Sequence, residues 1–155
     1  PNLRAYLDKS AAFIAMERHD GCRKGGKGYP CRAIRTGEYL YIKNFKPDRW
    51  PAGNPETMYH NVDGGPTKFV LLHSFDKYYR MSLGKPPAED LYLVQEGPDN
   101  VRNVAADLKY AETKRRLREK MEELLRAEGD PRLLGNADCF ETIGWTGNRK
   151  QAFDT

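Results

Sequence analysis

The chain has 155 residues, which is long enough for one domain with its own hydrophobic core. Hydrophobic residues make up 39% of it and charged residues 31%, and the mean hydropathy is −0.81, so we expect a surface rich in charge. The formal net charge of +4 is too small to indicate nucleic acid, and no apolar run approaches the roughly 18 residues that a membrane span needs.

The first element is an apolar run from Ala11 to Met16, which is compatible with a buried strand. Four polar residues, Glu17 to Asp20, end this run. Residues 21–30 then form a loop rich in glycine and lysine.

The second element is a hairpin. Residues 31–36 and 39–45 have the β-branched and aromatic composition of strands, and Gly37 and Glu38 join them. Aliphatic residues alternate with aromatic and basic ones along the second strand, so it has two different faces. The aliphatic residues are Leu40 and Ile42, and the others are Tyr39, Tyr41 and Lys43.

Two interpretations of the hairpin are open. Its cations and aromatic rings favour either a surface for sugars or single-stranded nucleic acid, or a core of aromatic rings with a solvated basic rim. The residues concerned are Arg32, Arg35, Lys43, Lys46, Arg49, Tyr39, Tyr41 and Trp50. For the whole hairpin we expect a scaffold role, with the aliphatic face in the core.

The remaining segments complete the expected fold. Residues 47–66 are irregular and proline-rich, residues 68–74 are a strand or a short helix, and residues 90–95 are a strand. A helix is predicted from Leu108 to Glu128, and residues 133–155 are an irregular tail. The predicted fold class is α+β: a small antiparallel sheet of about four strands, packed by one main C-terminal helix, with long loops.

The predicted helix has clear boundaries and one apolar face. Asp107 is the predicted N-cap, and Gly129 is the predicted end of the helix. The apolar face follows helical spacing through Leu117, Met121, Leu124 and Leu125. A helix with so narrow an apolar stripe is suited to lie on a sheet.

The cysteines do not indicate a metal site. Cys22, Cys31 and Cys139 lack the paired short spacings of zinc ligands, and an odd number cannot all pair within the chain. Cys22 and Cys31 form either one disulfide or two reduced thiols. Since the sequence also lacks the common nucleophile, phosphate-loop and metalloprotease motifs, we expect neither a catalytic nor a metal-binding residue in this chain.

The strongest candidate binding residues are Arg18 and His19. A guanidinium and an imidazole at the end of a strand can bind sulfate, phosphate or carboxylate through charge-assisted hydrogen bonds. The alternative is a solvated strand end with a salt bridge.

In order along the chain, these pieces resemble the carboxy-terminal part of bacterial formylglycine-dependent sulfatases. This family belongs to the alkaline-phosphatase-like superfamily and includes arylsulfatases and heparan N-sulfatases. The segments that carry the resemblance are Glu17–His19, Gly28–Thr36, Tyr39–Gly53, Asp63–Lys68, Gly84–Tyr92, Asn103–Ala105 and Gly129–Arg132.

The resemblance implies that residues 1–155 are a single carboxy-terminal domain, docked on a large amino-terminal α/β domain outside this chain. That domain would hold the formylglycine nucleophile and the calcium ion. Formylglycine is made from the cysteine of a Cys-x-Pro-Ser-Arg motif, whereas Cys31 is followed by Arg-Ala-Ile-Arg, so Cys31 is not the nucleophile.

The function implied is hydrolysis of sulfate esters or sulfamates of carbohydrates, with this segment alone inactive. Arg18 and His19 would bind substrate at the pocket rim, although Ala15 and Met16 replace the first two residues of the family's Gly-Arg-Glu-Arg-His pattern. The expected partners are the amino-terminal sulfatase domain and a sulfated carbohydrate, with no membrane partner and no nucleic acid. The resemblance implies a periplasmic or extracellular location. The alternative is a free-standing basic module that binds a polyanionic glycan or nucleic acid.

Overall fold

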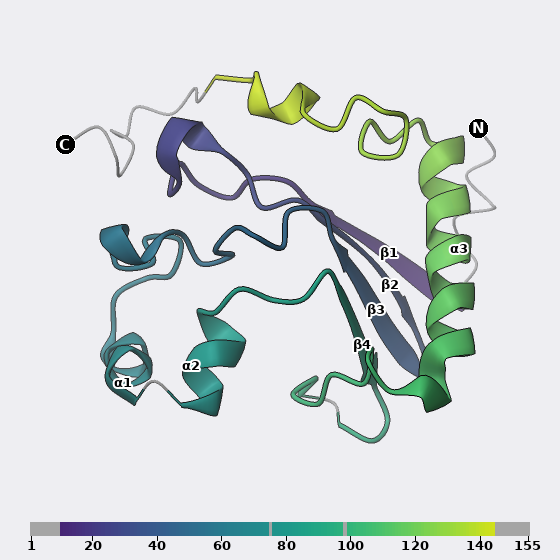
Figure 1. The fold of residues 1–155 in the computed structure, drawn as a ribbon, viewed down its shortest axis with the longest axis horizontal. Helices are drawn as coiled ribbons and strands as arrows, with labels where there is room; N and C mark the ends of the chain where they lie inside the picture. Colours follow the sequence, from purple (N-terminus) through teal and green to yellow (C-terminus); the bar gives the residue numbers. More distant parts are fainter. Residues whose placement is uncertain (1–9, 75, 98, 145–155) are drawn as a thin grey trace.

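The computed structural model describes residues 10–74, 76–97 and 99–144. Its centre is an antiparallel sheet of four strands in the order β1-β2-β3-β4. The strands are β1 Ala11–Met16, β2 Cys31–Thr36, β3 Tyr39–Asn44 and β4 Glu89–Leu93. The long helix α3, Ala111–Ala127, lies along one face of the sheet (Figure 1). The expected α+β class is therefore confirmed.

Two short helices, α1 Pro66–Ser74 and α2 Lys77–Ser82, lie in the connection between β3 and β4, away from α3 (Figure 1). Residues 68–74 thus form a helix, which is one of the two options that the sequence left open. The two helices pack on a second, smaller core, whose buried residues are Ala52, Tyr59 and Leu83. No helix in the described part of the chain is both long and apolar enough to cross a membrane.

The main core lies between the sheet and α3. Ile34, Tyr41 and Leu91 project from the three strands β2, β3 and β4, and Leu117 and Met121 project from α3 to meet them. The strand register pairs Ile34 with Tyr41 and Tyr41 with Leu91, so these three side chains point to the same face of the sheet.

The expectation that the aliphatic face of the hairpin is the core face is wrong. Tyr41 is fully buried against α3, whereas Leu40 and Ile42 lie on the opposite face and are only partly buried. The aromatic ring can enter the core because its hydroxyl reaches the carboxylate of Glu89 and donates a hydrogen bond to it. Of the two interpretations of the aromatic residues, the structure therefore favours the core.

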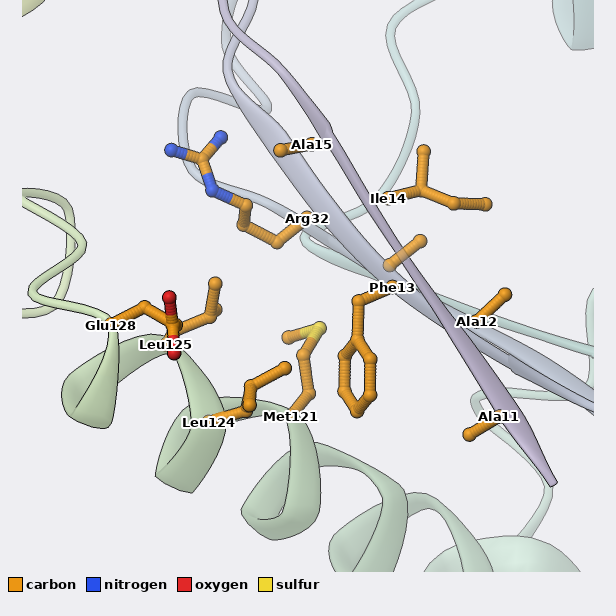
Figure 2. Close-up of a pocket in the computed structure, with 11 residues that line it drawn as sticks. Ala11, Ala12, Phe13, Ile14, Ala15, Arg32, Met121, Leu124, Leu125 and Glu128 are labelled. Carbon is orange, nitrogen blue, oxygen red and sulfur yellow. The ribbon is translucent and has the colours of Figure 1, made fainter. Parts of the chain in front are cut away.

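The first strand forms at the expected residues but is not buried. β1 lies at one edge of the sheet with β2 as its neighbour, and five of its six residues are exposed. Phe13 points toward α3 and Ile14 points away from it, as strand alternation requires (Figure 2). The apolar composition of Ala11–Met16 therefore belongs to an exposed edge, and the sequence alone could not distinguish this from burial.

The main helix is close to its predicted span. A 3-10 turn at Leu108–Tyr110 precedes α3, and Asp107 caps it by accepting a hydrogen bond from the Lys109 amide. Gly129 ends the helix with a φ of +76°, a conformation that glycine adopts without strain. Of the tail, residues 133–144 are irregular apart from a 3-10 turn at Cys139–Glu141, and residues 145–155 lie outside the described part.

The three cysteines are free thiols, so Cys22 and Cys31 are not bridged. Burial raises the pKa of both thiols. They are therefore protonated at neutral pH.

Candidate functional site

The candidate rim, Arg18 and His19, lies directly after β1, where the chain leaves the sheet. The Arg18 side chain is half-buried and connects two distant segments. Its Nη1 donates hydrogen bonds to the carbonyl oxygen of Gly26, at 3.0 Å, and to that of Ile143, at 3.1 Å. Arg18 is thus held between the 21–30 loop and the carboxy-terminal tail.

His19 is exposed and is oriented by Asn61. Nδ1 of His19 lies 2.7 Å from Oδ1 of Asn61, and Nδ2 of Asn61 donates to the carbonyl oxygen of Pro51. Because this second bond fixes the amide, Nδ1 of His19 carries the proton and donates to Asn61. The other ring nitrogen, Nε2, is then an acceptor on an exposed side chain, and it can bind a hydroxyl group.

Glu17, the residue before Arg18, is the centre of an ionic network. Its Oε1 lies 2.6 Å from Nη2 of Arg32, and its Oε2 lies 2.7 Å from Nη2 of Arg132. Arg32 also binds Asp130, with 2.6 Å between Nε and Oδ2. The salt-bridged strand end that the sequence offered as an alternative exists, and Glu17 forms it.

The network keeps its arginines charged although they are buried. Burial alone would lower the pKa of Arg32 and of Arg132. For Arg32, its hydrogen bonds to Asp130 and Glu17 outweigh the effect of burial, and the pKa is raised. For Arg132, its hydrogen bonds to Glu17 and the negative charges of Glu17 and Glu141 outweigh the effect of burial, and the pKa is also raised. Both side chains are therefore cations that hold the neighbouring carboxylates in place.

The 21–30 loop packs tightly against this strand end. The amide of Tyr29 donates to the carbonyl oxygen of Glu17 at 2.8 Å. A side chain at position 28 would overlap that same carbonyl group, so the close approach requires Gly28. Arg23, only 4% exposed, donates from Nε to the carbonyl oxygen of Trp50 at 2.9 Å and ties the loop to the chain after β3.

Three further residues of this region were not expected from the sequence. Lys24 and Lys27 are exposed and flank Gly26, whose carbonyl group binds Arg18, so they add positive charge near the rim. The lysine-rich composition of the loop was the signal that could have found them. Asn61 lies 42 residues from His19, and no local pattern predicts its role.

Three of the cationic side chains of the hairpin region form ion pairs within the protein. Lys43 binds Glu122 with 2.6 Å between Nζ and Oε1, and Arg49 binds Glu141 with 2.7 Å between Nη1 and Oε1. Lys46 lies 3.4 Å from Asp138. Because the rings are in the core and these charges are paired, the geometry favours the scaffold role of the hairpin.

One part of the chain is similar to a known protein. No family model matches the chain. A stretch of 102 residues, 66% of the chain, is 28% identical to an ulvan-active sulfatase from Formosa agariphila. The match spans 18% of that protein, so most of the relative has no counterpart here. The comparison supports the presence of a sulfatase-related region in this chain.

Proposed function

We propose that this chain is the carboxy-terminal segment of a sulfatase that hydrolyses sulfate esters or sulfamates of carbohydrates. The observation that carries this proposal is the similarity of 102 residues to a sulfatase. In this proposal the segment completes the substrate pocket and stabilises the fold, while the nucleophile lies elsewhere in the protein.

Arg18 and His19 are the proposed substrate-binding residues. The guanidinium supplies a permanent positive charge for sulfate or carboxylate groups of the substrate. Nε2 of the exposed His19 accepts a hydrogen bond from a sugar hydroxyl. Both side chains are oriented by bonds within the protein, so little conformational entropy is lost when substrate binds.

The described residues do not fit the calcium site of the family. Within 10–74, 76–97 and 99–144 there is no group of three or more His, Cys, Asp or Glu side chains that could hold a metal ion. Calcium and formylglycine are therefore proposed for the amino-terminal domain, and no catalytic step is assigned to residues of this chain.

We further propose that exposed apolar residues of this segment dock on the amino-terminal domain. On β1, Ile14 is 50% exposed and Met16 is 40% exposed, on the face away from α3. On α1 and α2, the exposed apolar side chains are Phe69, Val70, Tyr78 and Met81. An exposed apolar surface can mark an interaction site, and the rest of a sulfatase chain is the occupant that fits the comparison. A periplasmic or extracellular location also remains part of this proposal.

The test is a sulfate-release assay on the full-length protein purified from its native host, after intact-mass analysis. Ion chromatography would measure free sulfate from O-sulfated and N-sulfated oligosaccharides. Release from at least one of these classes supports the proposal. A native protein that releases no sulfate but binds polyanionic glycan, with affinity falling steeply with salt, would replace it with the binding module.

A further inference from the structure

The tail after α3 forms a strap across the strand end that carries the candidate rim. We use the name strap for residues 129–144. In Figure 1 the strap runs from the end of α3 toward the carboxy terminus, on the side of the 21–30 loop. Four acid–base pairs connect it to the sheet and its loops: Asp130–Arg32, Arg132–Glu17, Asp138–Lys46 and Glu141–Arg49.

The strap contacts two consecutive residues, Glu17 and the rim residue Arg18. Arg132 donates from Nε and Nη2 to both carboxylate oxygens of Glu17, with distances of 3.2 Å and 2.7 Å to Oε2. The next residue, Arg18, donates to the carbonyl oxygen of Ile143 in the same strap. The strap therefore holds Glu17 by its side chain and Arg18 by its guanidinium.

We propose that Arg132 is a positioning residue for the substrate rim, which acts through Glu17 on Arg18. This inference rests on the proposed function, because it assigns a task to the same rim. Arg132 does not touch substrate in this proposal. It fixes the direction in which the Arg18 side chain leaves the strand end.

The burial and geometry of the pair support this role. The Arg132 side chain is 1% exposed and that of Glu17 is 21% exposed, so the pair is poorly screened by solvent. The two-oxygen contact restricts the carboxylate in direction as well as distance, which a single ammonium group cannot do. The Glu17 carbonyl oxygen is also bound by the Tyr29 amide, so the backbone next to Arg18 is held from two sides.

The main competing explanation is that Arg132 only stabilises the fold. Arg132→Lys keeps the positive charge but loses the contact with both carboxylate oxygens of Glu17. Lys43→Gln is the control variant, because it breaks a different partly buried ion pair, the one between Lys43 and Glu122 on α3. Both variants would be made in the full-length protein. A purely structural role predicts that both lower the melting temperature without a selective effect on the rim.

The first measurement is independent of activity. Hydrogen exchange followed by mass spectrometry would report on the Tyr29 amide, whose acceptor is the Glu17 carbonyl oxygen. We expect faster exchange in the peptide that contains Tyr29 for Arg132→Lys, and no change for Lys43→Gln. Equal exchange in wild type and Arg132→Lys would overturn the inference, whether or not the protein is a sulfatase. If Arg132→Lys does not fold, Glu17→Gln provides the same comparison, because it keeps the side-chain volume and removes the carboxylate charge.

The second measurement is a double-mutant cycle on kcat/KM. We expect Arg132→Lys to lower kcat/KM by about tenfold, since misplacement of a binding group by about 1 Å can cost up to about 100-fold. In the Arg18→Ala background the same substitution should have no further effect on kcat/KM, while its effect on the melting temperature persists. If the effects of Arg132→Lys and Arg18→Ala on kcat/KM were fully additive, the proposal that Arg132 acts through Arg18 would be overturned. Absence of sulfate release from the wild type would instead overturn the proposed function and leave the exchange result standing.

Discussion

Tyr41 on β3 and Leu91 on β4 lie directly opposite each other, and neither side chain is exposed to solvent. Both point toward α3, where they meet Leu117 and Met121. The stability of the sheet therefore depends on its contact with α3, because the strands alone would leave this face in water.

The first prediction concerns this core. Leu91→Ala should lower the free energy of unfolding by roughly 2–5 kcal/mol, because it removes buried methyl groups and leaves a cavity. Leu108→Ala is the matched control, since the Leu108 side chain is 88% exposed and its loss should cost at most about 0.5 kcal/mol. Urea unfolding of both variants checks this. Equal costs would show that the Leu91 side chain is not in the core.

The second prediction concerns the decrease in the free energy of unfolding at acidic pH. Burial would raise the pKa of Glu89, but the Tyr41 hydrogen bond and the charges of Lys114 and Arg118 outweigh it and lower the pKa. A carboxylate with a lowered pKa in the folded state stabilises the protein above the ordinary glutamate pKa of about 4.3, and this contribution is lost as the pH falls through the lowered value. Glu89→Gln should therefore lower stability at pH 7 and flatten its fall below about pH 4.

The free energy of unfolding of the Glu89→Gln variant would be measured by urea titration between pH 7 and pH 3. Glu38→Gln is the control, because Glu38 is exposed at the hairpin turn. An unchanged slope below pH 4 in Glu89→Gln would contradict the assignment of this acid sensitivity to Glu89.

The third prediction concerns the rim and tests the proposed function in the full-length protein. Arg18→Ala should raise KM or lower kcat/KM by about 10- to 100-fold, because a hydrogen bond to a charged group contributes roughly 1.5–3 kcal/mol. Arg35→Ala is the control, since Arg35 is exposed near the other end of β2. Steady-state kinetics with a sulfated oligosaccharide checks both. Kinetics unchanged by Arg18→Ala would remove Arg18 from the substrate site.

The fourth prediction concerns the close approach at Gly28. Gly28→Ala should lower the melting temperature, because the new methyl group would overlap the backbone carbonyl of Glu17 and push the loop away from the rim. Gly37→Ala has open space around the added carbon and should leave the melting temperature nearly unchanged. Differential scanning fluorimetry of the two alanine variants is sufficient. Similar melting temperatures would show that the loop is not packed on Glu17.

Periodicity and turn chemistry predicted the β2–β3 hairpin and the helix, because both are local in sequence. The hairpin at residues 31–44 and the stop at Gly129 follow directly from such signals. Which face of a strand is buried depends instead on where α3 lies, so the role of Tyr41 could not be predicted from alternation alone. The exposure of the apolar β1 strand has the same cause, because the strand order decides which strand lies at the edge.

In the candidate rim, too, some residues could be predicted from the sequence and their partners could not. Arg18 and His19 were found from residue type and position at a strand end. Their partners Ile143 and Asn61 lie 125 and 42 residues away, and no local pattern connects such positions. The structure brings these residues together, while the role of the rim in substrate binding stays a prediction.

The separation between Glu17 and Arg132, 115 residues, also sets an order of assembly during translation. At about 5–20 residues per second, the ribosome needs on the order of ten seconds to reach Arg132 after it has made Glu17. During that interval Arg32 is made early and can neutralise Glu17, but the strap does not yet exist. The surface that we expect to recognise substrate is therefore completed only after the sheet and α3 have been synthesised.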